Sequence, residues 1–400
     1  MQARLKLAPP DASPSPARAA DTSVDPLAAL RLARSRNVGP ATWLRLVSRF
    51  GTPTRALEAL PDLARRGGAR EVGVASVAQA EREMEAGLAA RARLLVLGGP
   101  GYPDLLSRIP DPPPVLWMRG VDAVFSRPAA ALVGGRNASA LGLRLAETLA
   151  RDLSAAGWCV VSGLARGVDG AAHRGALSAT ETGLGATAAV LAGGVDHVYP
   201  SEHAALADEL AERGAVLSEA PPGLEPQARH FPRRNRIVAG LARGVVVVEA
   251  AERSGSLITA QFALEQGREV LAVPGAPLDP RSAGGNALIR DGATLARSAE
   301  DVIEALSPSL DPDAVPEAGE ATQTTLGLAE EAGAFRREAG ADAATRARVA
   351  ELLGLQPVEE DVLARLSGAP LAAVAETLME LELAGRLDRR PGGYLALLPE

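Results

Sequence analysis

The chain has 400 residues, of which 47% are hydrophobic and 23% are charged, and its formal net charge is −7. That length allows two or three domains with cores of their own, and the single cysteine, Cys159, excludes a disulfide framework and a cysteine-based zinc cluster. No stretch approaches the roughly 18 apolar residues that span a bilayer, and the N-terminus lacks the apolar centre of a signal peptide, so we expect a cytosolic protein with no membrane contact.

The first part of the chain predicts a tail followed by a small helical domain. Residues 1–23 are rich in Pro, Ala and Ser without periodicity, which is typical of a segment without regular structure. Residues 24–92 have helical apolar spacing, broken by a turn at 37–43 that contains one glycine. A helix, such a turn and a second helix suggest a helix-hairpin-helix, in which backbone N–H groups hold a phosphate. Simple helix packing explains the turn equally well.

The central part predicts an α/β domain. Residues 93–306 alternate short apolar runs, glycine-rich turns and amphipathic helices, as in a Rossmann-like, doubly wound parallel sheet that is covered on both faces. In that fold, ligands bind at the carboxyl ends of the strands, near the point where the strand order reverses. The expected strands are 129–134, 158–163, 187–192, 215–219, 244–250 and 269–275, with helices at 137–157 and 256–267.

The last part predicts a linker and a third domain. Residues 307–343 are rich in Pro, Glu and Ala, which indicates an acidic linker. Residues 344–400 have helical patterns followed by a hairpin around 391–393, which predicts a winged-helix domain. The helix expected before the hairpin, 371–385, is acidic and apolar. We therefore expect it to contact protein or to pack, rather than to enter a DNA groove.

Glycine-rich turns at the strand ends carry the chemistry of the α/β domain. In the first turn, Gly134 and Gly135 let the backbone approach a ligand closely, and Arg136 adds a positive charge at the start of a helix. Asn137 or Ser139 can cap that helix. Two further turns repeat the pattern with Ser162, Gly163, Arg166, Gly255 and Ser256. Each turn alone is explained by tight geometry, but together they predict an anion site.

The residues 228–244 form the most cationic segment of the chain. Arg233 and Arg236 lie near Phe231 and Asn235, and basic residues beside an aromatic ring are typical of single-strand binding. A helix face that is paired with neighbouring carboxylates is the alternative. The negative net charge counts against a nucleic-acid surface, but nearly all cationic side chains are Arg, which binds phosphate bidentately and stacks on bases. GC-rich coding is the simpler reason for the arginines.

Cofactor and metal motifs are missing. The sequence has neither G-x-G-x-x-G with an acidic residue ending the second strand nor a Walker motif, so we expect no nucleotide cofactor. The four histidines lack metal-binding spacing, which predicts no metal. No nucleophile motif G-x-S-x-G occurs, and we predict no catalytic residue. Glu219 and Glu249, each ending a strand, are the only acid–base candidates.

These motifs resemble the DNA-processing protein A family, known as DprA or Smf, over nearly the whole chain. The resemblance rests on ordered blocks at 102–120, 131–142, 160–177, 189–200, 217–223, 230–241, 254–275 and 284–293. It implies a sterile-alpha-motif-like or helix-hairpin-helix N-terminal domain, an extended Rossmann core and a C-terminal winged helix. It further implies a homodimer built on the Rossmann core, which binds single-stranded DNA and loads RecA recombinase onto it in natural transformation and sometimes in repair.

The resemblance also assigns residues. It implies that Arg136 is a principal DNA ligand, and it maps further contacts onto Ser162, Gly163, Asn235 and Arg236. Two positions depart from the family pattern: Gly135 replaces a serine, and Ser201 and Glu202 stand where some members have a DNA-binding lysine. The full predicted single-stranded DNA site is Gly134, Gly135, Arg136, Ser162, Gly163, Arg166, His203, Phe231, Arg233, Asn235, Arg236, Gly255 and Ser256.

Two other functions stay open from the sequence. The first is a nucleotide-monophosphate phosphoribohydrolase, an enzyme of a related Rossmann group that uses P-G-G-x-G-T-x-x-E. The nearest stretch here, 252–261, lacks the Thr after the second Gly and the closing Glu. The second is a protein adaptor that acts through the acidic linker and the C-terminal domain.

Overall fold

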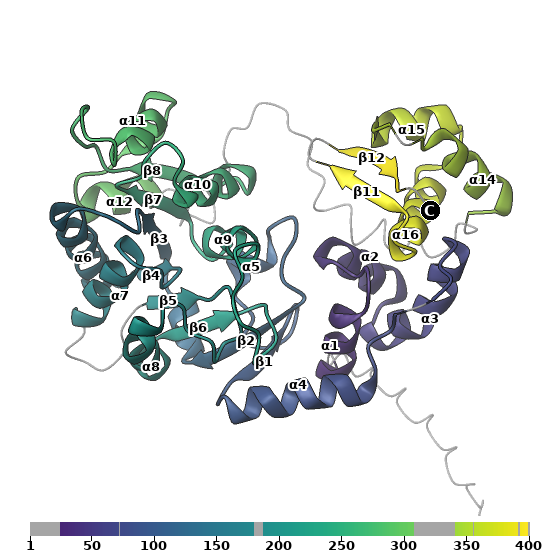
Figure 1. The fold of residues 1–400 in the computed structure, drawn as a ribbon, viewed down its shortest axis with the longest axis horizontal. Helices are drawn as coiled ribbons and strands as arrows, with labels where there is room; N and C mark the ends of the chain where they lie inside the picture. Colours follow the sequence, from purple (N-terminus) through teal and green to yellow (C-terminus); the bar gives the residue numbers. More distant parts are fainter. Residues whose placement is uncertain are drawn as a thin grey trace, which may run out of the picture.

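The computed structural model describes residues 25–71, 73–179, 187–307, 341–354, 356–390 and 393–398. The predicted N-terminal tail, and all but the ends of the predicted linker, lie outside these residues. Figure 1 shows two lobes: one contains the large sheet, and in the other the first helices lie beside the C-terminal domain.

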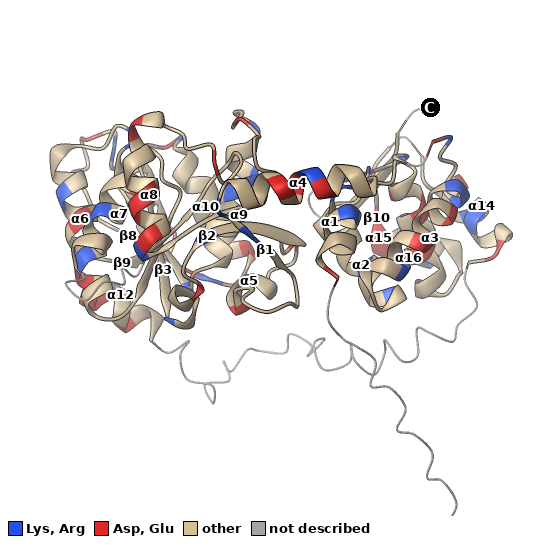
Figure 2. Ribbon diagram, turned by 90° about the horizontal axis from the view of Figure 1, so that it is seen from below, with Lys and Arg blue, Asp and Glu red and all other residues tan. Residues whose placement is uncertain are grey.

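The N-terminal domain is all helical, as predicted. Its helices are α1 (Pro26–Arg34), α2 (Pro40–Phe50), α3 (Pro53–Arg66) and α4 (Val77–Ala89). The first three begin with proline, which suits the first helical turn because an N–H there has no partner within the helix. Leu30, Leu46 and Leu60 are fully buried between them. Helix α4 runs from this lobe to the sheet (Figure 2).

The central domain is built on a nine-stranded sheet with the order β1-β2-β6-β5-β4-β3-β7-β8-β9. Every predicted strand is present. These are β3 (Ala129–Gly134), β4 (Cys159–Ser162), β5 (Thr187–Val190), β6 (Ala215–Ser218), β7 (Gly244–Val248) and β8 (Glu269–Ala272). They pair in parallel, and their residues are almost all buried, which matches their continuous apolar sequences.

The prediction of an entirely parallel sheet is wrong at one edge. Strands β1 (Arg93–Val96) and β2 (Val115–Gly120) pair antiparallel with each other, and β2 pairs antiparallel with β6. A short strand, β9 (Thr294–Leu295), forms the other edge. The sheet is therefore mixed, and its antiparallel edge faces the N-terminal domain: the Trp117 indole on β2 donates to Glu83 of α4 at 2.9 Å.

Helices cover both faces of this sheet (Figure 1). On one face, α6 (Ala140–Ala155), α7 (Val168–Ser178) and α12 (Ala299–Leu306) share an apolar core with the strands. On the other, α9 (His230–Gly240) and α10 (Gly255–Glu265) do so. The remaining helical elements of the domain are α5 (Asp104–Ser107), η1 (Asp122–Ser126), η2 (Ser201–His203), α8 (Ala204–Arg213) and α11 (Ala283–Arg290).

The strand order places a ligand crevice between two strands. From β3 the chain builds β4, β5 and β6 to one side, and it then returns to build β7 and β8 on the other side of β3. The order thus reverses between β3 and β7, and the crevice outside their carboxyl ends is where doubly wound folds bind ligands.

The C-terminal domain is a winged helix. Helices α14 (Ala343–Leu352), α15 (Glu360–Ser367) and α16 (Leu371–Leu383) pack on a three-stranded sheet of β10 (Val358–Glu359), β12 (Tyr394–Leu397) and β11 (Leu387–Arg390). The predicted hairpin is present as the antiparallel pair β11 and β12. Among the described helices, no single one is long and apolar enough to cross a membrane; α15 and α16 reach that composition only as a pair bent by 119°.

Candidate functional site

A cavity of about 490 Å³ opens at the reversal point of the sheet, within the size range of ligand sites. It lies beyond the carboxyl ends of β3 and β7 and against the first turns of α9 and α10. Its lining includes predicted site residues from all three glycine turns and from the cationic segment: Gly134, Gly135, Arg136, Gly163, Phe231, Asn235, Gly255 and Ser256. The structure therefore brings these residues, which are distant in sequence, into one pocket.

The first turn is held by a carboxylate. Ser139 caps α6, as expected, because its hydroxyl accepts the Gly142 N–H at 3.0 Å. Glu249, just after β7, accepts the backbone N–H of Ser139 at 2.7 Å and also its hydroxyl. A Cβ on Gly142 would lie 2.4 Å from the Glu249 carboxyl carbon, so only glycine admits this contact. Glu249 is thus a positioning residue and not an available general acid or base.

Arg136 and Phe231 line the pocket, and a second aromatic ring lies beside Phe231. Arg136 is exposed, and it forms no ion pair with any acidic residue that the structure describes. Its guanidinium carbon lies 5.1 Å from the centre of the Phe231 ring, a cation–π distance. The ring of Tyr199 meets Phe231 edge to face at 5.7 Å between centroids, and Tyr199 is 48% exposed. We call these three side chains the platform. Tyr199 was not predicted; its position beside Phe231 depends on the fold.

A buried charge pair forms the floor. Arg234 is fully enclosed, donates to the carbonyl of Gly163 at 2.6 Å and to that of Val190, and faces Asp169. A Cβ on Gly163 would lie 2.2 Å from the Arg234 guanidinium, so this glycine makes room for the arginine. Burial raises the pKa of the Asp169 carboxyl, opposed by Arg234, and burial lowers the pKa of Arg234. Arg234 therefore supports the pocket floor from within the fold.

Further cations at the rim were missed by the sequence analysis. Arg253 and Arg281 both line the pocket and are exposed. Arg281 is paired with Asp279 at 2.8 Å, whereas Arg253 forms no ion pair with a described residue. Their only sequence signal is proximity to the third turn. The start of α10 also faces the pocket and carries Gly255 and Ser256; the Ser254 hydroxyl caps the Ser256 N–H there, and the helix dipole adds to the positive field.

Some predicted residues lie outside the pocket. The hydroxyl of Ser162 is fully buried and donates to the carbonyl of Leu132 at 2.6 Å. His203 directs Nδ1 to the carbonyl of Leu164 at 2.9 Å. Arg166 is exposed but forms two hydrogen bonds of 2.8 Å with Glu202. The residue that replaces the family's lysine thus neutralises a neighbouring arginine.

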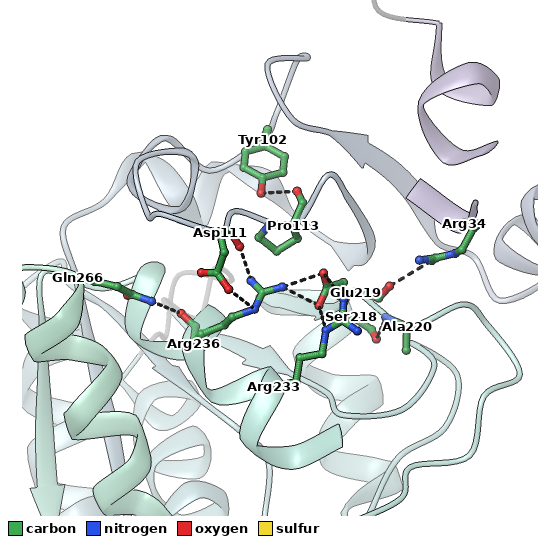
Figure 3. Close-up of polar contacts among 10 residues, drawn as sticks. All are labelled: Arg34, Tyr102, Asp111, Pro113, Ser218, Glu219, Ala220, Arg233, Arg236 and Gln266. Carbon is green, nitrogen blue, oxygen red and sulfur yellow. Dashed lines mark hydrogen bonds and ion pairs between the residues drawn. The ribbon is translucent and has the colours of Figure 1, made fainter. Parts of the chain in front are cut away.

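Arg236 is placed differently from the prediction (Figure 3). Its side chain is only 4% exposed, and it donates to both carboxylate oxygens of Glu219, at 2.7 and 2.8 Å, and to the carbonyl of Asp111 at 2.8 Å. Arg233, which is 61% exposed, reaches the same Glu219 at 3.3 Å. The hydrogen-bonding capacity of Arg236 is thus used inside the fold, and its contact with DNA stays a prediction. Glu219, held by two arginines, is not a free acid or base.

The buried histidine has a structural contact, as expected. His173 has its Nδ1 2.8 Å from the Thr187 hydroxyl, and burial lowers the pKa of this imidazole to about 3. Among the described residues, no group of three or more His, Cys, Asp or Glu side chains is placed to hold a metal ion.

Comparison with known proteins agrees across all three domains. Family models match residues 24–86 as a DprA-like N-terminal HHH domain, 93–307 as DNA recombination-mediator protein A, and 334–393 as a DprA winged helix domain. Protein Smf of Escherichia coli is 40% identical over 300 residues, which cover 74% of this chain and 75% of that protein. DNA processing protein DprA of Bacillus subtilis is 47% identical over 206 residues, covering 51% of this chain and 68% of that protein.

A solved structure supports the same fold. The X-ray structure of DNA processing protein A from Streptococcus pneumoniae matches with a TM-score of 0.60 and 35% identity, and the match covers 71% of this chain and 98% of that one. Of the two N-terminal domains that the sequence left open, the family model favours the helix-hairpin-helix.

Proposed function

Because this chain belongs to the DNA recombination-mediator protein A family, also named DprA or Smf, we propose that its Rossmann-like core binds single-stranded DNA without reading the sequence. The observation that carries the proposal is the platform: an exposed arginine, without a carboxylate partner in the described structure, lies over the Phe231 ring in the pocket lining, and the exposed ring of Tyr199 lies beside it.

Phosphate and base are bound by different groups in this proposal. Arg136 and Arg253 bind phosphates as charged hydrogen-bond donors. A base stacks on Phe231 or Tyr199, and each stacked base contributes about 1–3 kcal/mol. Stacking tolerates every base, because each has a π-face, whereas the bases of a duplex are already stacked on one another. The pocket therefore favours a single strand over a duplex.

The finer role follows from the family. We propose that the protein acts in the cytoplasm as a homodimer through its Rossmann core, and that it delivers the strand to RecA recombinase during natural transformation and repair. Two pockets related by a dimer axis would hold one strand at two points, so the second contact forms at a high effective concentration. The description of the family as a recombination mediator supports this role.

The hydrogen-bond partners of the two candidate carboxylates support DNA binding rather than catalysis. A phosphoribohydrolase needs a carboxylate that reaches the glycosidic bond. Of the two candidates, Glu219 is held by Arg233 and Arg236, and Glu249 is held by Ser139. We therefore favour a DNA-binding protein over this enzyme.

Two assays test the proposal. Fluorescence anisotropy with labelled single-stranded and duplex oligonucleotides, at several salt concentrations, should show tighter binding of the single strand. RecA filament nucleation should then be measured on strands coated with single-strand-binding protein, and it should be faster with this chain present. Equal affinity for both DNA forms would refute the binding mode, and unchanged nucleation would refute the loading role alone.

A further inference from the structure

The helix before the wing lies against the N-terminal domain. Figure 1 shows α16 beside α2 and α3, although these elements are separated by most of the chain. Arg45 pairs with Glu382 at 2.7 Å, and Arg49 pairs with Glu376 at 2.7 Å. A third arginine, Arg66, lies 3.8 Å from Glu380 and 4.0 Å from Glu376. Figure 2 shows acidic and basic residues side by side where α16 and α3 meet.

The contact between α16 and the N-terminal domain is closely packed and also contains ion pairs. Met379 and Leu383 of α16 belong to the same apolar core as the N-terminal helices, whereas Val374 and Leu378 belong to the core of the winged helix. A Cβ on Gly67 would lie 1.9 Å from the Glu380 carbonyl oxygen, so this glycine allows the helix to approach. Helix α16 is therefore buried from two sides, which explains why its apolar residues are not confined to one face.

The carboxylate of Glu382 occupies the start of α2. It accepts the Thr42 hydroxyl at 2.6 Å, and its other oxygen accepts from Arg45 at 2.7 Å. Thr42 lies in the first turn of α2, directly after the hairpin turn, and the N-cap residue Gly39 makes no side-chain cap. Asn37, before the same turn, donates to the carbonyl of Leu383 at 3.0 Å. An anionic oxygen of this chain thus sits where the helix terminus and two side chains favour negative charge.

We infer that Thr42, Arg45, Arg49 and Arg66 form a second DNA-backbone-binding surface, and that α16 covers it as a lid. Phosphate offers these side chains the same anionic oxygens that Glu376 and Glu382 now supply. With the lid closed, the arginines are neutralised and the carboxylates of α16 repel DNA. With the lid open, three arginines from one side of the N-terminal domain are free for phosphates.

Phosphate can replace the carboxylates in these ion pairs. The side chains of Arg45, Arg49 and Arg66 are 33%, 29% and 51% exposed, so water and salt reach them. Their carboxylate partners are less exposed, 20% for Glu382 and 6% for Glu376, so salt screens the Arg45–Glu382 pair more than the Arg49–Glu376 pair. A polyanion can therefore compete with the lid. In this arrangement the winged-helix domain controls access to the N-terminal surface and does not itself read DNA through α16.

The test uses the full chain in an Arg136→Ala background, so that it does not depend on the pocket. The lid is opened with Glu376→Gln and Glu382→Gln, which remove negative charge without adding positive charge. Opening is followed by energy transfer between dyes on Leu88→Cys and Leu366→Cys, two exposed positions on α4 and α15. The native Cys159 is fully buried and should not label.

We expect the glutamine pair to reduce energy transfer and to raise DNA affinity at least about fivefold, for both single-stranded and duplex probes. Because three arginines would reach phosphates, the slope of log K against log salt should steepen by about 2 for a single strand and by about 3 for a duplex. Adding Arg45→Gln and Arg49→Gln should remove most of this gain. Arg45→Gln with Arg49→Gln, made without the glutamate changes, should show no gain in DNA affinity.

Three results would overturn the inference. One is an open lid without increased affinity. Another is a gain that persists after the arginines are replaced. The third is unchanged energy transfer in the glutamine variant, provided that circular dichroism shows it folded. Since every protein in this set lacks Arg136, loss of strand binding at the pocket cannot produce any of these results.

Discussion

Replacing Arg136 with alanine removes the cation of the platform. Its contact with a phosphate is a charged hydrogen bond, which contributes about 1.5–3 kcal/mol. The increase in Kd for a single strand should therefore be roughly 10- to 150-fold. The salt slope should fall by about 0.7, because one phosphate contact is lost.

The assay is fluorescence anisotropy of a labelled single strand over a salt series, with the thermal unfolding midpoint measured in parallel. Stability should fall by at most about 1 kcal/mol, because the only described partner that Arg136 loses is the Phe231 ring. Arg151→Ala is the matched control: Arg151 is also a solvent-facing arginine, on α6, and it pairs with its neighbour Asp152. A folded Arg136→Ala protein that binds within twofold of the unchanged chain would refute the assignment.

Other substitutions should separate binding from folding. Phe231→Ala should weaken single-strand binding by about 1–3 kcal/mol and leave duplex binding unchanged in the same anisotropy assay, while Phe231→Tyr should retain most of the affinity. Arg236→Ala should instead lower stability to urea by about 3–5 kcal/mol, because Glu219 would stay buried without its main partner; a stable variant with weak binding would show that Arg236 contacts DNA after all. The folded-state pKa of His173 is lowered to about 3, so only the unfolded chain takes up this proton as the pH falls below about 6.5. The free energy of unfolding therefore loses nothing to this proton well above that pH, and it should fall by about 2 kcal/mol between pH 6.5 and 5. Urea unfolding of His173→Gln should show a smaller pH dependence, and an equal dependence would contradict the lowered pKa.

The parallel strands of the central sheet could be predicted because each is buried on both faces and is therefore a nearly continuous run of apolar residues. The Gly244–Val248 strand is valine after its first residue, and it is buried throughout, so its run is apolar without alternation. The antiparallel edge could not be predicted in this way. Arg93–Val96 is short and only half buried, and nothing local in its sequence says which strand it pairs with.

The sequence predicted which turns line the pocket, but not which of the arginines are paired with carboxylates. A sequence shows that Arg136 and Arg236 are both arginines next to glycine or asparagine, but it does not show which carboxylate lies across the fold from each. Glu219 comes from a different strand end and neutralises Arg236, while Arg136 is left free in the described structure. Likewise, Arg253 reaches the pocket and Tyr199 reaches the Phe231 ring only through the packing of separate turns.

The position of α16 also could not be predicted from the sequence alone. Its acidic and apolar sequence correctly favoured packing over a DNA groove, because carboxylates repel phosphates. Its partner could not be identified, since Arg45 and Glu382 are far apart in the sequence and meet only in the folded chain.

The most direct test of strand binding at the pocket is photo-cross-linking with a single strand that carries iodouracil, followed by identification of the modified peptides. We predict adducts on Tyr199 or Phe231, the two rings that are placed to stack a base, and their strong reduction in Arg136→Ala. Adducts confined to the N-terminal or winged-helix domain, with none near these rings, would contradict the proposed site.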